Sequence, residues 1–300
     1  MRLTFLGTAG SWPTKERSAS AIALDTEREL VLFDCGEGTQ RQFFQSTASF
    51  MRVRRIFITH FHGDHFLGLP GLVQSMNLNN RTEPLDIYGP PDAKEMVERA
   101  LHLGYYTQRF PIQIHPLAPD QTVELDGYRI RTAHAEHPVP TIAYRLEEGP
   151  KRGRFNAERA RAMGIKGKDF ARLELGEPVH VGDRIVHAAD LQGPPRPGRS
   201  IVYSGDTSPC EDIRRLAHRA TLLIHEATTS SDIEAEANKW GHSSARQAAQ
   251  LASDAQVETL FLTHFSSRYK EVEPLETEAR VLFPPSQAAR DLLDHLIRQP

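Results

Sequence analysis

A cluster of potential metal ligands directly after an apolar run constrains the fold more than any other feature of this sequence. Residues 53–60, VRRIFITH, have the β-branched, apolar pattern of a buried strand. The last residue of this run and the loop after it, FHGDH, together give four candidate ligands within six residues: His60, His62, Asp64 and His65. Zinc prefers neutral imidazoles and carboxylates that converge on one point. The sequence therefore predicts a metal site at the carboxyl end of a strand, where α/β sheets usually build their sites.

Short strands and amphipathic helices alternate along most of the chain. We expect strands at residues 2–7, 20–25, 30–36, 53–60, 85–90, 111–117, 122–135, 142–148, 200–207, 220–228 and 259–266. We expect helices at residues 39–47, 69–80 and 91–104, from Glu211, from Ser243, and near 286–298. Because strands and helices are mixed in both halves of the chain, we expect a fold of the α/β class, with the architecture of a four-layer αββα sandwich.

Composition allows one large globular domain over residues 1–300, because 39% of the residues are hydrophobic. No stretch approaches the roughly 18 apolar residues of a membrane helix. The first ten residues lack the pattern of a secretory signal, so we expect a cytoplasmic protein that does not enter a membrane. Two cysteines, Cys35 and Cys210, are too few for a disulfide framework.

A basic segment interrupts the alternation of strands and helices. Residues 151–172 contain eight Lys or Arg against two acidic residues, although the whole chain has a net charge of −3. Between residues 148 and 200 we find no strong strand and one short helix near 156–163. Phosphate binding needs a locally positive surface, and a long loop inside a compact domain is usually functional or mobile.

Three further candidate ligands stand where strands run into loops: His137, Asp206 and His264. Each repeats the position that His60 has in its own strand and loop. As a set they complete the shell of a dinuclear site. His134 competes with His137, but Pro138 fixes His137 at the exit from the strand, so His134 is better explained as a strand residue.

Longer motifs now show a family resemblance that covers nearly the whole chain. The segments are THFHGDH, SGDT, THFSSRY, FLGTAGSWPTKERSAS, DCGEGTQRQ, HEAT and GHSSA. Together they resemble the metallo-β-lactamase superfamily and, within it, the short form of the ribonuclease Z family, which processes tRNA 3′ ends. The HxHxDH pattern alone gives only the superfamily. DCGEGTQRQ, HEAT and HFSSRY are specific to the subfamily.

The resemblance implies two zinc ions per subunit. One would be bound by His60, His62 and His137, the other by Asp64, His65 and His264, with Asp206 as the bridge. It also gives Asp64 the role of proton acceptor, while His242 and Glu226 help proton transfer to the leaving group. The alternatives from the residues alone are a solvent-facing Glu226 and a His242 that caps the helix after it.

The implied function is a zinc-dependent endoribonuclease that removes the 3′ trailer of tRNA precursors by attack of a metal-activated hydroxide, leaving a 3′-hydroxyl on the tRNA. The resemblance also implies a homodimer and a protruding, flexible basic arm, inserted at residues 150–192, that binds precursor tRNA. Candidate substrate contacts are Arg268 and, in the arm, Lys151, Arg152, Arg154, Lys166 and Lys168. The alternatives are a small-molecule or general phosphodiesterase of the same fold, and a non-catalytic RNA-binding protein.

Three positions depart from the family pattern. The arm has Gly167-Lys168 where a Gly-Pro pair is usual. The N-terminal block PTKERS ends in Ser18, whereas this block usually ends in Asn. The motif HSS replaces the commoner HST. The block at Ser18 is linked in the family to the CCA end, so the sequence leaves discrimination against CCA-bearing precursors open.

Overall fold

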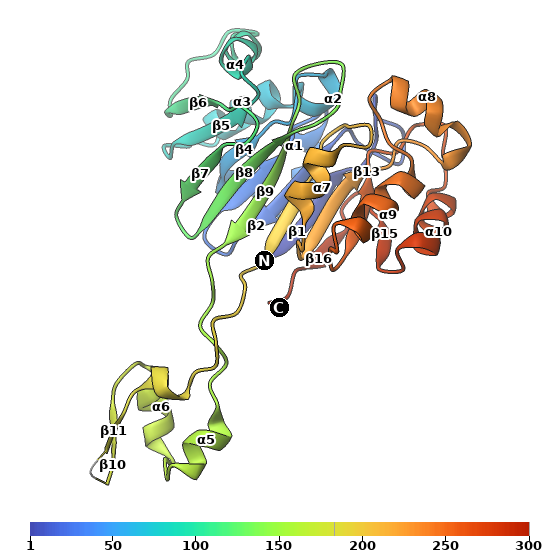
Figure 1. Ribbon diagram of the computed structural model, residues 1–300. Coiled ribbons are helices and arrows are strands. Elements are labelled where there is room, and N and C mark those ends of the chain that lie inside the picture. Colours follow the sequence, from blue (N-terminus) through green and yellow to red (C-terminus); the bar gives the residue numbers. More distant parts are fainter. Residues whose placement is uncertain (183, 300) are drawn as a thin grey trace. The chain divides into compact units, whose positions relative to one another are not determined.

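The computed structural model describes residues 1–182 and 184–299. Within it, two seven-stranded sheets form the body of the protein (Figure 1). The first sheet has the order β16 (Asp294–Leu296), β1 (Arg2–Gly7), β2 (Ala21–Asp25), β3 (Leu30–Phe33), β4 (Val53–Phe57), β5 (Leu85–Gly89) and β6 (Ile112–Pro116). The second has the order β15 (Ser286–Ala288), β14 (Leu260–Thr263), β13 (Leu222–Glu226), β12 (Ser200–Tyr203), β9 (Ile142–Glu148), β8 (Tyr128–His134) and β7 (Thr122–Leu125).

Aromatic side chains join the two sheets. Phe33 of β3 lies 6.2 Å from Tyr144 of β9 and 6.0 Å from Tyr203 of β12, between ring centroids. Both tyrosine rings are fully buried, so each hydroxyl needs a partner. Tyr144 donates to the carbonyl of Ile58, and Tyr203 donates to the carboxylate of Asp34. These contacts fix the loops after β3 and β4 against the second sheet.

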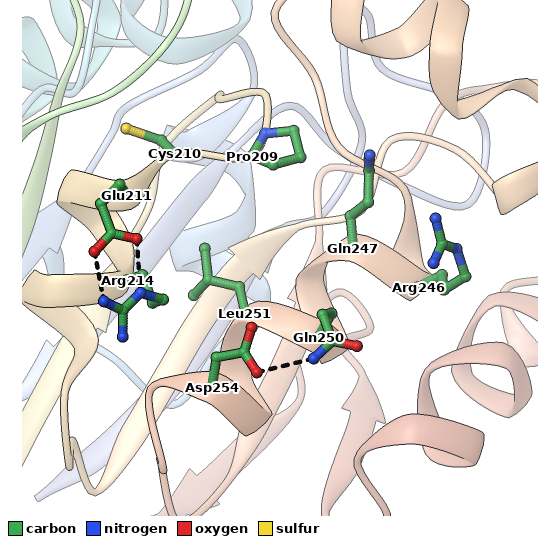
Figure 2. A pocket seen from close by; sticks show the side chains of 9 residues that line it. All are labelled: Pro209, Cys210, Glu211, Arg214, Arg246, Gln247, Gln250, Leu251 and Asp254. Atoms are coloured by element: carbon green, nitrogen blue, oxygen red, sulfur yellow. Dashed lines mark hydrogen bonds and ion pairs between the residues drawn. The ribbon is translucent and has the colours of Figure 1, made fainter.

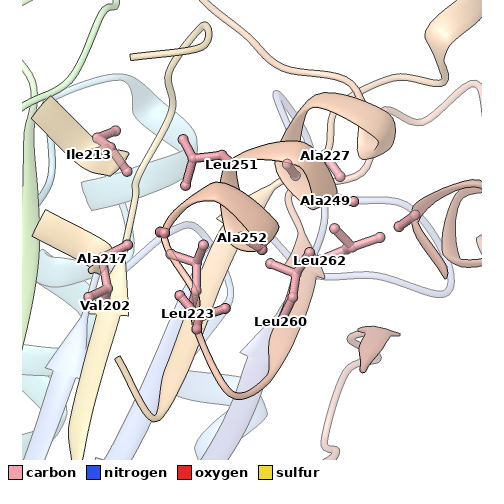
Figure 3. Close-up of a cluster of buried hydrophobic side chains, with 14 of the residues drawn as sticks. Val202, Ile213, Ala217, Leu223, Ala227, Ala249, Leu251, Ala252, Leu260 and Leu262 are labelled. Atoms are coloured by element: carbon pink, nitrogen blue, oxygen red, sulfur yellow. The ribbon is translucent and has the colours of Figure 1, made fainter. Parts of the chain in front are cut away.

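Helices cover the outer face of each sheet, which completes the expected four-layer αββα sandwich. Apolar side chains of α1 (Thr39–Gln45), α3 (Leu69–Leu78) and α4 (Ala93–Leu101) form one core with the first sheet. Those of α7 (Glu211–Ala217), α9 (Ala245–Asp254) and α10 (Glu273–Leu282) form another with the second sheet (Figure 3). The parallel strands β12 to β14 are buried on both faces, as strands with helices over them must be.

The helix expected near residues 286–298 is wrong. This segment forms β15 and β16, which pair with β14 and β1 at an edge of each sheet. Its apolar spacing suits a helix, but backbone pairing at two open sheet edges decides its structure. The run 122–135 also divides into β7 and β8, which are joined by a turn with Gly127 at φ 89°.

Residues 148–198 form a second compact unit. It contains α5 (Ala157–Ala162), α6 (Lys168–Glu174) and two short antiparallel strands, β10 (Val179–Val181) and β11 (Arg184–Val186). The helix expected near 156–163 is therefore present, whereas the expected lack of strands is wrong. A small core of its own holds this unit together and consists of Ala160, Ile165, Leu173, Val179, Val186 and Leu191.

The remaining elements are short. They are α2 (Gly63–Phe66), α8 (Glu234–Lys239) and the 3₁₀ turns η1 (Phe50–Arg52), η2 (Ala188–Leu191) and η3 (Ser231–Ile233). In the described part of the chain, we find no helix with the length and apolar character needed to cross a membrane.

Candidate metal centre

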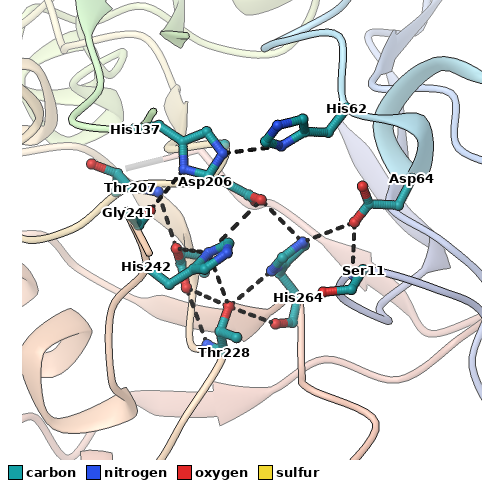
Figure 4. A network of polar contacts seen from close by, with 12 residues as sticks. Ser11, His62, Asp64, His137, Asp206, Thr207, Thr228, Gly241, His242 and His264 are labelled. Carbon is teal, nitrogen blue, oxygen red and sulfur yellow. Dashed lines mark hydrogen bonds and ion pairs between the residues drawn. The ribbon is translucent and has the colours of Figure 1, made fainter. Parts of the chain in front are cut away.

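The seven predicted ligands converge from four strand ends of the two sheets. His60 and His62 follow β4, and Asp64 and His65 lie in α2 immediately afterwards. The others come from the second sheet and follow β8, β12 and β14: His137, Asp206 and His264. Figure 4 shows the side chains that it labels from this set turned toward one another.

Two triads of ligand atoms are recognisable. In the first, Nδ1 of His62 lies 3.1 Å from Nε2 of His60 and 3.1 Å from Nε2 of His137. In the second, Nε2 of His264 lies 3.3 Å from Nε2 of His65 and 3.3 Å from Oδ2 of Asp64. Within each triad, the ligand atoms all lie within 4.8 Å of one another.

Asp206 lies between the two triads. Its Oδ2 is 3.8 Å from Nε2 of His60, 3.3 Å from that of His65 and 3.2 Å from that of His264. Its Oδ1 is buried and has no hydrogen-bond partner among the described residues. A buried carboxylate oxygen without a partner is costly, and a cation would remove that cost.

The protonation of the histidines fits a cation site. Burial lowers the pKa of His60, His62 and His137, so these imidazoles are neutral, as metal ligands must be. His137 donates from Nδ1 to the carbonyl of Gly241 at 2.9 Å, which leaves the lone pair of Nε2 directed into the cluster. Burial lowers the pKa of His65, but the carboxylates of Asp206, Asp34 and Asp64 outweigh this effect and raise it well above its ordinary value. The three carboxylates thus favour a positive charge at the position of the His65 ring.

Asp34, which was not among the predicted site residues, supports the second triad. It is fully buried at the end of β3, and its Oδ2 accepts from Nδ1 of His65 at 2.7 Å. It also accepts from the Thr59 amide at 2.7 Å and from the Tyr203 hydroxyl at 2.8 Å. A carboxylate in this position fixes the ring and tautomer of a metal-binding histidine. Its position in the DCGEGTQRQ block, directly after a strand, is the signal that could have identified it.

Glu226 and His242 form a buried pair beside the ligands. Oε1 of Glu226 accepts from Nδ1 of His242 at 2.9 Å, and this carboxylate raises the pKa of His242 to about 9 against the opposing effect of burial. Glu226 is 1% exposed, so it does not face solvent. The helix after His242 is capped by Ser244, which accepts from the amide of Gln247. Both alternative interpretations of this pair are therefore wrong.

Thr228 connects this pair to the second triad, a contact that the sequence did not predict. Its Oγ1 donates to Oε2 of Glu226 at 2.7 Å and lies 2.9 Å from Nδ1 of His264. The left-handed backbone of His264, at φ 58°, turns its ring back toward this threonine. The HEAT motif thus supplies both a carboxylate and a hydroxyl to the centre.

Comparison with known proteins identifies the family. The ribonuclease Z of Methanothermobacter thermautotrophicus is 49% identical over 98% of this chain and 95% of its own length. That of Methanosarcina acetivorans is 44% identical over 98% of this chain and 97% of its own length. The chain belongs to the ribonuclease Z family. It is therefore an endoribonuclease of the hydrolase class.

One solved structure agrees with membership of the ribonuclease Z family, and a second structure and a family model agree with the fold. The short form of human tRNase Z superposes with a TM-score of 0.73, at 28% identity, over 99% of this chain and all of that one. A model described as beta-lactamase superfamily domain matches residues 184–265, and one described as anti-Pycsar protein Apyc1 matches residues 1–147. YhfI from Bacillus subtilis shares the fold, with a TM-score of 0.70 over 98% of this chain, at 20% identity. The metallo-β-lactamase fold implies a divalent metal at the centre.

The other predicted residues of this ribonuclease Z family member lie outside the ligand cluster. Arg268 is exposed, and its amide donates to Oγ of Ser266 at 3.4 Å. The five basic residues of the arm belong to the unit of residues 148–198, where Lys151 is half-buried and pairs with Glu148 at 3.0 Å. The other four are exposed: Arg152, Arg154, Lys166 and Lys168. His134 lies in a different group, with Cys210 and Asp212.

A cavity of about 330 Å³ between α7 and α9 contains none of the predicted site residues (Figure 2). Charged and polar side chains on its wall are paired with one another. Arg214 donates to Glu211 at 2.7 Å, and Gln250 donates to Asp254 at 2.9 Å. The cavity thus offers few unsatisfied polar groups to a ligand.

Proposed function

We propose that this protein is a zinc-dependent endoribonuclease that cleaves the 3′ trailer from tRNA precursors and leaves a 3′-hydroxyl on the tRNA. The observation that carries this proposal is the pair of ligand triads that meet at Asp206, with the Glu226–His242 pair beside them. The ribonuclease Z relatives and the human tRNase Z structure support the choice of substrate. A precursor tRNA is the proposed partner.

The donor set of nitrogen and oxygen atoms fits two zinc ions per subunit. His60, His62 and His137 would hold one ion, Asp64, His65 and His264 the other, and Asp206 would bridge the two. Bound there, the ions would supply positive charge for the phosphate oxygens and would lower the pKa of water toward neutrality.

Asp64 is the proposed proton acceptor for the attacking water. Its Oδ2 faces Nε2 of His264 and accepts from the amide of Ser11 at 2.7 Å. The nearby histidines outweigh the effect of burial and lower its pKa, so the carboxylate is ionised at neutral pH. The amide of Ser11 keeps the carboxylate in place while it changes partners.

His242 is the proposed donor of the proton to the leaving oxygen. Cleavage that leaves a 3′-hydroxyl on the tRNA makes that 3′ oxygen the leaving group, and an alkoxide leaves poorly without a proton. His242 carries a proton at neutral pH because its pKa is about 9. Its Nδ1 is held by Glu226, so Nε2 is the nitrogen available to the substrate.

The arm is the proposed tRNA-binding exosite. Residues 150–192 would form a flexible insertion in a single metallo-β-lactamase domain of residues 1–300, and their Lys and Arg side chains would contact the RNA backbone. Arg268 would pair with a phosphate. A homodimer and a cytoplasmic location complete the proposal.

A small-molecule or general phosphodiesterase is the second candidate, and one observation favours it. All seven ligands, Glu226 and His242 belong to the unit of residues 1–147 and 199–298, so the centre is built without the arm. Replacement of residues 151–190 by a short turn would distinguish the tRNA endoribonuclease from the general phosphodiesterase. The first proposal expects loss of tRNA cleavage with retained hydrolysis of an aryl phosphodiester. Equal cleavage of both substrates after the deletion would contradict a role for the arm.

The decisive experiment incubates the purified, zinc-loaded protein with precursor tRNA that either contains or lacks the CCA sequence. Mapping of the 3′ end is expected to place the cut at the start of the trailer, with a 3′-hydroxyl on the tRNA. Cleavage at scattered positions, or no cleavage by a protein that hydrolyses aryl diesters, would refute the tRNA assignment.

A further inference from the structure

The two tryptophans of the chain, Trp12 and Trp240, are both exposed, by 60% and 51%. Single exposed apolar residues are common and need no explanation by themselves. These two differ because each adjoins a backbone group that hydrogen-bonds a side chain of the candidate centre. The described chain has other exposed aromatic residues, such as Tyr105 in the loop after α4, without this connection.

Trp12 follows a turn that packs against one side of the centre. Ser11 has φ 67°, and its amide donates to Oδ2 of Asp64 at 2.7 Å. Gly10 is so close to His264 that a Cβ at this glycine would lie 2.7 Å from the ring. Standard peptide geometry then places Cα of Trp12 no more than about 8 Å from the Asp64 carboxylate.

Trp240 occupies an equivalent position on the other side. The next residue, Gly241, has φ 79°, and its carbonyl accepts from Nδ1 of His137 at 2.9 Å. A Cβ at Gly241 would lie 2.6 Å from that nitrogen, so the backbone is pressed against the ligand. Cα of Trp240 therefore lies no more than about 9 Å from the imidazole of His137.

The two segments approach the centre from opposite ends. Figure 4 shows Ser11 beside Asp64 at one end of the polar network and Gly241 beside His137 at the other. An exposed lysine accompanies each tryptophan, Lys15 three residues after Trp12 and Lys239 directly before Trp240. Each end thus combines an aromatic surface with a cation, the pair of groups that binds an unpaired nucleic-acid strand.

We propose that Trp12 and Trp240 stack on nucleobases on opposite sides of the scissile phosphate and so hold an unpaired RNA strand across the centre. This inference rests on the proposed endoribonuclease function and defines its substrate further. Stacking uses the flat face that every base has, so it selects an unpaired strand without selecting its sequence. Paired bases are stacked within their duplex and cannot occupy these positions.

Kinetics provide the first test. Trp12→Ala and Trp240→Ala are each expected to raise KM for precursor tRNA about tenfold, with a smaller effect on kcat, because one stacked base is lost. Trp12→Phe and Trp240→Phe keep an aromatic face and are expected to recover most of the loss. Tyr105→Ala removes an aromatic residue that is even more exposed than either tryptophan, and it serves as the control. Parental KM in both alanine variants would overturn the proposal.

Fluorescence provides a second test that does not depend on turnover. The Phe variants leave one tryptophan each, so Trp12→Phe reports on Trp240 and Trp240→Phe on Trp12. Mixing with precursor tRNA in a stopped-flow instrument is expected to quench both. An abasic nucleotide directly 5′ of the cleaved phosphate should remove the quenching of one tryptophan, and an abasic nucleotide directly 3′ that of the other. Quenching that neither abasic substitution changes would overturn the proposal.

The same measurements separate this inference from the proposed function. Suppose that an unpaired oligoribonucleotide quenches the fluorescence in an abasic-sensitive way but precursor tRNA is not cleaved. This result would support the two stacking sites and would refute the assignment of tRNA as the substrate. Cleavage of precursor tRNA without quenching in either single-tryptophan variant would refute the stacking sites and would support the assignment of tRNA as the substrate.

Discussion

Oδ2 of Asp34 lies 2.7 Å from Nδ1 of His65, and both side chains are fully buried. Asp34 directly follows strand β3 of the first sheet, while its second partner Tyr203 belongs to the second sheet. The orientation of a candidate metal ligand is therefore coupled to the packing of the two sheets. Changes in this packing should be detectable as changes in metal binding.

Asp34→Asn should lower the affinity for zinc about 10- to 100-fold, because His65 loses the carboxylate that orients it. Metal content after dialysis against a weak chelator measures the effect. Tyr203→Phe is the matched control, because it removes one hydrogen bond to Asp34 and keeps the carboxylate. Full metal content and activity in Asp34→Asn would contradict the supporting role of Asp34.

His137→Ala and His134→Ala form a matched pair of substitutions three residues apart. The first should remove metal and lower kcat/KM for precursor tRNA by at least about 100-fold, because one triad loses a ligand. The second should leave both quantities near the parental values, because His134 is exposed and outside the cluster. Elemental analysis and cleavage assays provide the measurements. The opposite result would make His134 the ligand.

Asp64→Ala should abolish hydrolysis and leave tRNA binding largely intact, because the proposed role of the carboxylate is to act on the attacking water and the proposed RNA contacts lie in the arm and at Arg268. Gel-shift titration and cleavage under single-turnover conditions separate the two effects. A rate above about a tenth of the parental rate would be incompatible with the assigned role, since general base catalysis contributes about 10²- to 10⁴-fold.

Glu226→Gln should slow cleavage about 10- to 100-fold with little change in KM, because the amide no longer stabilises the protonated ring of His242. The carboxamide keeps the size of the side chain, so the fold should be preserved. A precursor whose leaving 3′ oxygen is replaced by sulfur needs less protonation. Its cleavage should be much less sensitive to the substitution, and equal slowing of both substrates would count against proton transfer through this pair.

Stability should depend on pH through Glu147. Burial opposes ionisation of this carboxyl, but Arg129, Arg145 and Arg131 outweigh it and lower its pKa below the ordinary 4.5. A lowered carboxyl pKa stabilises the folded state above pH 4.5, and this contribution is lost as the pH falls through the lowered value. Glu147→Gln should therefore cost about 1 kcal/mol at pH 7, after allowance for solvent screening, and less at pH 3, where part of this contribution is lost.

Urea denaturation at the two pH values measures this difference. Glu124→Gln, on the neighbouring strand pair and exposed, is the control that should show little effect at either pH. A destabilisation by Glu147→Gln that is equally large at pH 3 and pH 7 would indicate lost packing and not lost charge.

Local sequence patterns were sufficient to predict the layers and the strand ends at which the candidate ligands converge. Four of the candidate ligands lie within six residues: His60, His62, Asp64 and His65. The strand before them has a strong apolar pattern, so recognition of the strand and of this cluster does not depend on distant contacts. Asp34 and Thr228 were missed because their roles come from partners that are 31 and 36 residues away, respectively. Residues 286–298 were misassigned because open sheet edges, which a local pattern does not contain, determine their structure.

The inserted unit begins and ends at neighbouring positions of one sheet. Glu147 of β9 and Ser200 of β12 are direct partners across an antiparallel pair, so a turn of a few residues could replace the whole segment between them. The entropic cost of closing a loop grows only slowly with its length, which means that insertions of different sizes at this point disturb the sheet little. The segment can therefore be exchanged as a cassette. With the tRNA-binding role proposed for it, such an exchange would change substrate preference while the residues of the metal centre stay the same.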